Sequence, residues 1–297
     1  MDGKSIVVFG LRFIALCMVM FVALSIGGVV TGQQATTEET SASLLPLFIV
    51  VILNTTVLTY AIIRSKWYGP RLIGVVFITL FGIQTFMSQI ETLIFIPSIN
   101  AIPIFIMGLV TAAIFSPPAV IILGKMHREP ETDEKNVRLI MLGREWAWKL
   151  CVTAALFVIL YFTFGYFIAW QNPAVREFYG GELIGFVPHM MTIVQDNPRL
   201  VPFQVLRAML WVALALPVIR MMKGKLWETA LTVGLLFAVL LNSQLLIPNP
   251  YMPEAVRMAH LVETAPSIFI FGLIVVWLLS RHHSSFRDLF SRVKEDV

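Results

Sequence analysis

Eight runs of apolar residues divide the chain, and they constrain its fold more than any other feature. Each run is long enough to cross the roughly 30 Å hydrocarbon core of a bilayer as a helix. The chain is 58% hydrophobic and only 13% charged, a balance that soluble domains of this length do not need. We therefore expect an all-α, polytopic membrane protein. The predicted spans are 5–31, 43–64, 71–96, 101–124, 146–170, 201–221, 226–247 and 259–280.

Basic residues gather in alternate loops, which predicts the orientation of the chain. One side of the predicted bundle carries Lys4, Arg64, Lys66, Arg71, Lys125, Arg128, Lys135, Arg138, Arg144, Arg220, Lys223, Lys225, Arg281, Arg287, Arg292 and Lys294. The other side carries Arg176, Arg199 and Arg257. Because cytoplasmic loops are enriched in Lys and Arg, both termini are expected in the cytoplasm and the protein in the cytoplasmic (inner) membrane. The net charge of +4 then reflects topology, so the bilayer is the expected partner and nucleic acid is not.

Matching segments in the two halves of the chain predict an internal repeat. Pro46–Arg64 aligns without gaps on Pro202–Arg220, and Leu80-Phe81 corresponds to Leu236-Phe237. Further along, Ser88-Gln89 corresponds to Ser243-Gln244 after a slip of one residue, and the pairs Arg12 with Gly28 and Lys149 with Gly165 have the same separation. The last match joins Ile104–Leu109 to Ile268–Leu273. Since four helices return the chain to its starting side, the two four-helix repeats should be parallel.

The predicted organisation has four segments. The first repeat covers 1–125, a solvated cytoplasmic loop covers 126–145, the second repeat covers 146–280, and a cytoplasmic amphipathic tail covers 281–297. The second repeat contains an outer loop, 171–200, that has no counterpart in the first. Apolar residues recur in this loop at helical spacing and predict a short interfacial helix that either covers the outer mouth of the bundle or only rests on the membrane. These residues are Leu183, Phe186, Val187, Met190, Met191 and Val194.

Polar stripes on three of the predicted spans are the candidate site. They fall in the outer halves of the spans, where ionisable side chains within a bilayer need partners. The stripes are Gln84, Ser88 and Glu91; Gln204, Arg207 and Trp211; and Arg257, His260, Glu263 and Ser267. We expect Glu91, Arg207, His260 and Glu263 to converge on an outward-facing pocket between the repeats, with Trp211 as a wall. The predicted ligand-binding residues are Gln84, Glu91, Arg207, Trp211, Gln244, His260 and Glu263.

These residues leave several functions open. A transporter or a protein that binds a small polar solute or ion would use the pocket, and a polar path should then continue inward from Gln84 past Asn54. A membrane-embedded enzyme acting on a lipid or isoprenoid would use Glu91, His260 or Glu263 as acid, base or ligand, with a closed inner end and a lateral opening. A scaffolding subunit would use the same charges as an ion-pair network that fixes packing.

The sequence predicts neither a metal nor a cofactor. Glu91, His260 and Glu263 could be metal ligands by residue type, with His189 as a further candidate, but Arg207 would repel a cation. Haem held by two imidazoles needs histidines on several spans, and only His260 lies within one. Motifs for nucleotide binding or nucleophilic catalysis are not found.

Overall fold

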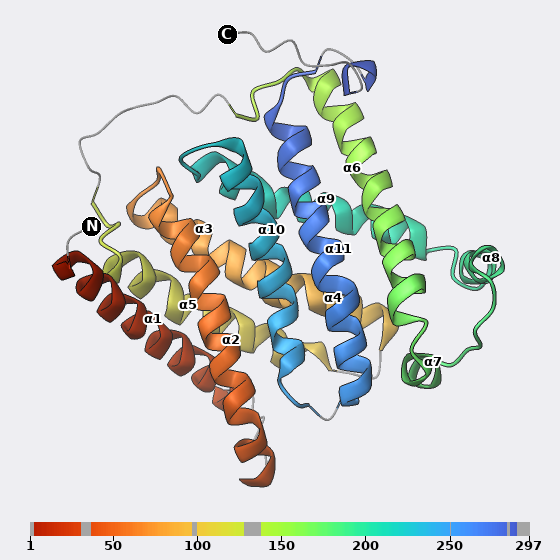
Figure 1. Ribbon diagram of the computed structural model, residues 1–297, viewed down its shortest axis with the longest axis horizontal. Helices are drawn as coiled ribbons and strands as arrows, with labels where there is room; N and C mark the ends of the chain where they lie inside the picture. The colour runs from red at the N-terminus through yellow and green to blue at the C-terminus, as the bar shows by residue number, and fades with distance from the viewer. Residues whose placement is uncertain are drawn as a thin grey trace.

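The computed structural model describes residues 3–30, 37–96, 100–127, 138–249, 251–283 and 286–289, and every regular element in these ranges is helical (Figure 1). The α-helices are α1 (Gly3–Val30), α2 (Thr37–Ile63), α3 (Gly69–Leu80), α4 (Met87–Phe95), α5 (Ala101–Ile122), α6 (Gly143–Phe164), α7 (Pro173–Tyr179), α8 (Phe186–Asp196), α9 (Leu200–Met221), α10 (Leu226–Asn242) and α11 (Glu254–Ser280). Two π-helical turns, η1 (Phe81–Phe86) and η2 (Gly165–Ala169), and two 3₁₀ turns, η3 (Ser243–Leu246) and η4 (Phe286–Leu289), complete the described part.

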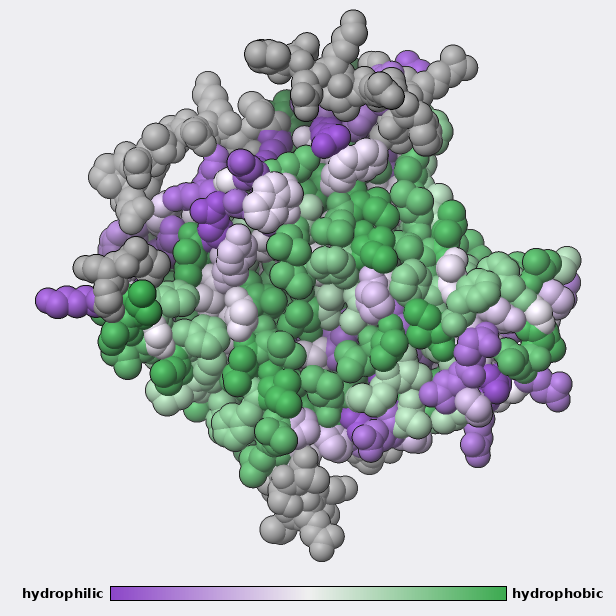
Figure 2. Space-filling view, viewed as in Figure 1, coloured by the Kyte–Doolittle hydropathy of each residue, from purple (hydrophilic) through white to green (hydrophobic). Residues whose placement is uncertain are grey.

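Eight helical segments within the described ranges are long and apolar enough to cross a bilayer, which confirms the eight predicted spans. Figure 2 shows the matching surface, a broad apolar area with hydrophilic residues gathered toward its ends. These are the features of an integral membrane protein. The eight segments are Lys4–Val30, Ser43–Ile63, Gly69–Phe95, Ala101–Ile122, Gly143–Ala169, Leu200–Met221, Leu226–Leu246 and Glu254–Ser280.

The first residues of several helices explain where they begin. Asn100 caps α5 by accepting a hydrogen bond from Ile102 N at 3.2 Å, and Asn172 caps α7 by accepting from Ala174 N at 3.0 Å. The last span begins at Glu254, five residues before the predicted start at 259, because Pro253 occupies the residue before the helix. A proline there loses no helical hydrogen bond, so the polar residues that follow it can be helical.

The spans pack in a regular order. The main contacts join α10 to α11, α1 to α5, α3 and η1 to α5, and α6 to α9 and α11. Further contacts join the two halves of the chain: α2 packs on α10 and η3, α9 packs on α3, η1 and α4, and η1 packs on α10. We call the end where α2, α5 and α9 finish the basic end, since it carries Arg64, Lys66, Arg71, Lys125 and Lys223, and the other the loop end, since α7 and α8 connect helices there.

Two glycines allow close approach between neighbouring helices. A Cβ on Gly272 of α11 would lie 2.7 Å from the Cα of Gly234 in α10, so the two backbones touch. A Cβ on Gly108 of α5 would collide with the side chain of Thr85 in η1. A larger residue at either glycine would force its helix away from its neighbour.

The π turn η1 interrupts the third span in its middle. Met87 N donates to Gly82 O across five residues, whereas an α-helix would use four. The turn therefore contains one more residue than the same length of α-helix. It buries Gln84 and Thr85, and such turns often occur where a helix contributes to a functional site.

The outer loop contains the predicted short helix and one helix that was not predicted. Its amphipathic segment does form a helix, α8, but α8 lies at the edge of the molecule, beyond α7 (Figure 1). It does not cover the mouth of the bundle. The helix that packs on α11 is α7, which the sequence did not predict, and Val175 of α7 is buried against Val256 of α11.

Some predicted features lie outside the described residues. They include Arg128 and Lys135 of the loop at 126–145, residues 97–99 of the turn before α5, and most of the amphipathic tail at 281–297. Within that tail only residues 281–283 and the short turn η4 are described.

Candidate functional site

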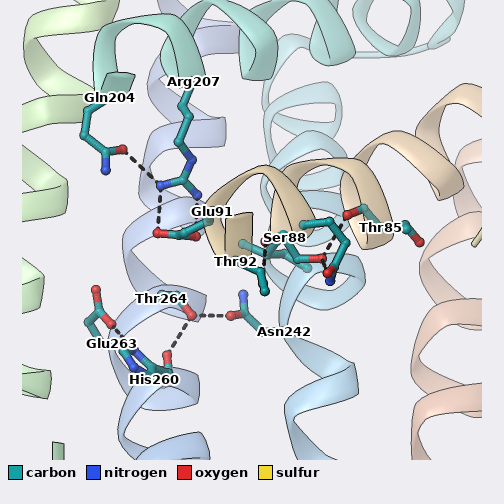
Figure 3. Close-up of polar contacts among 12 residues, drawn as sticks. Thr85, Ser88, Glu91, Thr92, Gln204, Arg207, Asn242, His260, Glu263 and Thr264 are labelled. Carbon is teal, nitrogen blue, oxygen red and sulfur yellow. Dashed lines mark hydrogen bonds and ion pairs between the residues drawn. The ribbon is translucent and has the colours of Figure 1, made fainter. Parts of the chain in front are cut away.

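Glu91 of α4 and Arg207 of α9 form an ion pair between two helices that are far apart in the sequence (Figure 3). Arg207 Nη1 donates to Glu91 Oε1 at 2.9 Å and Arg207 Nη2 donates to Glu91 Oε2 at 2.7 Å, so the guanidinium binds both carboxylate oxygens. Arg207 Nη1 also donates to Gln204 Oε1 at 3.0 Å. The Arg207 side chain is 4% exposed and that of Glu91 is 31% exposed. The predicted meeting of acid and base is confirmed, and the carboxylate is the accessible partner.

One face of α9 presents more hydrogen-bond donors than the described residues satisfy. Gln204, Arg207 and Trp211 lie one turn apart and are all buried. Gln204 Nε2, Arg207 Nε and Trp211 Nε1 have no acceptor among the described residues. A buried donor without an acceptor is unfavourable by about 1–3 kcal/mol, so this face suits a group rich in acceptor oxygens. Trp211 is fully buried and packs on Phe237, with 4.5 Å between ring centroids.

His260 and Glu263 form a second pair, one turn apart on α11. His260 Nδ1 lies 3.0 Å from Glu263 Oε2, and the other ring nitrogen, Nε2, lies 3.1 Å from the hydroxyl of Tyr179 on α7. Burial raises the pKa of Tyr179 above its usual value, and so do the negative charges of Glu91 and Glu263. The hydroxyl therefore keeps its proton and can donate it to Nε2, which leaves Nδ1–H to donate to Glu263.

The two pairs are separate but electrostatically linked. Glu263 interacts with the charges of Glu91 and Arg207, and His260 interacts with that of Glu91. Tyr161 of α6 lies within range of the same carboxylates and of Arg207. The four predicted charged or titratable residues therefore occupy one region, although no hydrogen bond between described residues joins one pair to the other (Figure 3).

Gln84 and Gln244 belong to another network, nearer the middle of the bundle. Asn54 Nδ2 donates to Gln84 Oε1 at 3.2 Å, and Ser243 Oγ donates to Asn54 Oδ1 at 2.8 Å. Gln244 Nε2 donates to the backbone carbonyl of Gln84, in the π turn, at 2.9 Å. These two predicted site residues thus contact each other and not the ion pairs, because the π turn directs Gln84 toward α2 and α10.

Arg257 binds backbone carbonyls and not the other candidate site residues, although it shares a helix face with His260. Its Nη1 donates to Leu245 O at 2.7 Å and to Ile247 O at 2.9 Å. These carbonyls belong to the last residues of the seventh span, where a helix has no internal donors for them and attracts a cation. Arg257 therefore closes the turn before α11 and does not contribute to the candidate site.

The structure adds residues that sequence reasoning missed. Thr264 contacts Asn242 through its hydroxyl, which also lies 2.6 Å from His260 O (Figure 3). The position of Gln204, three residues before Arg207, indicated its role, but it was not included in the predicted set. Tyr179 had no signal in the sequence, because a loop residue gains such a contact only through the path of the chain.

The alternative metal site is not formed. Among the described residues, no three His, Cys, Asp or Glu side chains are placed so that they could hold a metal ion. Glu91 is bound by Arg207 at both oxygens, and both ring nitrogens of His260 already have partners. His189 lies elsewhere, in α8, where its ring packs on Trp170 with 4.7 Å between centroids.

Comparison with protein-family models, with curated proteins and with solved structures finds no match to this chain.

Proposed function

We propose that the protein binds a small polar solute between α4, α9 and α11 and carries it across the membrane. The observation that carries this proposal is the excess of buried donors beside an accessible carboxylate, namely Gln204 Nε2, Arg207 Nε and Trp211 Nε1 next to Glu91. Acceptor oxygens of a carboxylate, carbonyl or hydroxyl group would satisfy these donors. A pocket with a few convergent polar groups within an apolar bundle is typical of such sites.

The predicted internal repeat gives this site its position between two halves. The one-residue slip between Ser88-Gln89 and Ser243-Gln244 supports the repeat, because the π turn η1 accommodates one additional residue at that place in the first half. Gly108 and Gly272, which correspond in the alignment, both make the close helix contacts of their halves. The contacts of α2 with α10 and of α9 with α3 and α4 are equivalent under the same alignment.

The proposed orientation places the loop end outside the cell. The basic residues of the loops at the other end support it, since cations are retained on the cytoplasmic side. Glu91 and His260 would then be reached from outside.

Buried polar groups toward the basic end favour transport over simple binding. Asn54 connects Gln84 to Ser243 in the middle of the bundle. Closer to the basic end, the hydroxyls of Thr59 and Thr79 are buried and have no hydrogen-bond partner among the described residues. A polar solute moving inward would find these groups within an otherwise apolar core.

A membrane-embedded enzyme acting on a lipid or isoprenoid is the second candidate. The contacts of His260 with Glu263 and Tyr179 favour it, because a carboxylate that orients an imidazole is a common arrangement for a general base. An enzyme would convert a lipid substrate in a purified, solute-free preparation, and a transporter would not.

The test of solute binding is thermal unfolding of the purified protein with a panel of small carboxylates, amides and amino acids. A ligand that binds the folded protein raises its unfolding temperature. We expect at least one member of the panel to do so, with the rise lost in Gln204→Leu, which keeps the ion pair but removes an unpaired donor. Glu228→Gln at the basic end is the matched control and should keep the rise. An equal rise in Gln204→Leu would refute this location.

A further inference from the structure

The contacts of Tyr179, His260 and Glu263 form a continuous line from the loop end into the bundle. The hydroxyl of Tyr179, at the end of α7, lies 3.1 Å from His260 Nε2, and His260 Nδ1 lies 3.0 Å from Glu263 Oε2. The Glu263 side chain is 8% exposed and that of His260 is 21% exposed. The line therefore runs from a more accessible imidazole to an enclosed carboxylate, which is the arrangement of a proton path.

The net charge of Glu91, Arg207, His260 and Glu263 is zero when one proton is bound to the His260–Glu263 pair. Glu91 and Arg207 neutralise each other through their two hydrogen bonds. Glu263 has no guanidinium or ammonium partner among the described residues, so its charge is balanced only if His260 is protonated. A net charge inside an apolar bundle is costly, and one bound proton removes it.

We infer that His260 and Glu263 bind one exchangeable proton, which reaches them through Tyr179 from the loop end. The inference rests on the proposed function in one respect, since the proton would be the ion coupled to the solute bound beside Arg207. Solute and proton would then affect each other's binding equally, as linkage requires.

The proton step needs no other reactant. In the unprotonated state Tyr179 donates its hydroxyl hydrogen to Nε2, and Nδ1–H donates to Glu263. A hydronium ion at the loop end gives a proton to the oxygen of Tyr179 and becomes water, while the hydrogen already on that oxygen passes to Nε2. Tyr179 regains its original composition, and the imidazole becomes an imidazolium that donates to Tyr179 and to Glu263.

Charged and titratable groups from each neighbouring element act on this proton. The carboxylates of Glu91 and Glu263 attract it, and the guanidinium of Arg207 repels it. The hydroxyls of two tyrosines complete the set, Tyr161 from α6 and Tyr179 from α7. The helix α10 contributes only the neutral Asn242, through Thr264.

The test is a pH titration of the full-length protein, labelled with ¹⁵N-histidine and reconstituted in phospholipid nanodiscs. The chain has five histidines, and His260→Gln identifies the signal of that residue. We expect both ring nitrogens of His260 to carry hydrogen after acidification within about pH 5 to 8, the usual range of histidine. In Glu263→Gln the same signal should no longer titrate there. His282→Gln, at the basic end and with its side chain 67% exposed, is the matched control and should leave the His260 titration unchanged.

Tyr179→Phe tests whether the proton reaches His260 through Tyr179, separately from whether His260 and Glu263 bind it. The substitution should leave the protonated fraction of His260 nearly unchanged at equilibrium and slow its proton exchange, measured by line shape. If Glu263→Gln does not fold, Glu263→Asp retains the carboxylate at a longer distance and should shift the His260 titration. The inference is overturned if the His260 signal never titrates in the wild type. It is also overturned if the signal titrates in both Glu263 variants as it does in the wild type.

The proton inference and the proposed solute binding can fail separately, and the two experiments distinguish these failures. If a solute raises the unfolding temperature of the wild type but His260 does not titrate through Glu263, the proton inference is wrong and solute binding stands. If His260 titrates through Glu263 but no solute in the panel binds, the proton site stands and the proposed solute site is wrong.

Discussion

Among the residues that the structure describes, two ion pairs connect the first half of the chain to the second, at opposite ends of the bundle. At the loop end Glu91 binds Arg207, whose side chain is 4% exposed. At the basic end Arg64 binds Glu228, and the Arg64 side chain is 37% exposed. The guanidinium is thus enclosed in the first pair and partly exposed in the second, whereas the carboxylates of Glu91 and Glu228 are 31% and 18% exposed.

The two ends differ more in the backbone hydrogen bonds that join the two halves of the chain. At the basic end Lys66 N donates to Met221 O at 2.6 Å and Lys223 N donates to Arg64 O at 2.7 Å, on either side of the bridge between Ser65 and Met222. At the loop end, no backbone–backbone hydrogen bond joins the two halves among the described residues. We therefore predict that the contact between the two halves is more stable at the basic end than at the loop end.

The largest effect that this comparison predicts is on stability after loss of Arg207. Arg207→Ala should destabilise the protein by about 1–3 kcal/mol, because the Glu91 carboxylate, which is 31% exposed, loses both of its hydrogen bonds to the guanidinium. Reversible unfolding in mixed detergent micelles measures the free energy. A loss below about 1 kcal/mol, the range of a surface ion pair, would mean that the two ends do not differ as described.

A double-mutant cycle tests whether Glu91 and Arg207 act as one unit. Glu91→Gln removes the opposite charge, so in its presence Arg207→Ala should change the unfolding free energy far less than it does alone. We expect a coupling of about 1–3 kcal/mol from the same unfolding measurements, as for residues in one hydrogen-bonded network. Additive effects would show that the residues do not meet.

At the basic end we expect a smaller, salt-dependent effect. The hydrogen bond from Arg64 to Glu228 raises the pKa of Arg64, but its exposure lets solvent and ions weaken the attraction. Glu228→Gln should therefore destabilise by about 1 kcal/mol or less, and less again in high salt. Unfolding at two ionic strengths measures this, and a cost equal to that of Arg207→Ala would remove the contrast.

The smallest effect concerns pH at the loop end. Burial against Trp170 lowers the pKa of His189 in α8, so the folded protein binds a proton there less readily than the unfolded chain does. Stability should thus be full above the ordinary histidine pKa of about 6.5 and fall as the pH drops below it. Tryptophan fluorescence during acid titration reports the change, and His189→Gln should reduce it. An unaltered titration in that variant would assign the change to other groups.

Local sequence patterns predicted the spans and the Glu91–Arg207 pair. Hydropathy is a property of each segment alone, so the eight helices could be read without the fold. A carboxylate and a guanidinium placed in apolar runs each need a partner, which made their meeting predictable. The partner of Arg257 was not, because the free carbonyls of Leu245 and Ile247 leave no trace in side-chain composition.

Tertiary packing decided the features that the sequence did not predict. The π turn at 81–86 was not predicted from the sequence, and its effect on Gln84 depends on the neighbours of that helix. The apolar spacing of α8 predicted a helix but not its place at the edge of the molecule. The role of Tyr179 depends on how α7 packs against α11, which joins residues that are 81 positions apart.

The most direct test of the central claim, that the buried charges form a site reached from the loop end, is labelling of a single cysteine. In a background with Cys17→Ser and Cys151→Ser, a cysteine is placed by Thr92→Cys, next to Glu91, or by Ser65→Cys at the basic end. We predict that a membrane-impermeant maleimide added outside intact cells labels the cysteine at position 92, that the solute found by thermal unfolding slows this labelling, and that position 65 is not labelled. Labelling at position 65 only, or at neither position, would contradict a site that opens outward at the loop end.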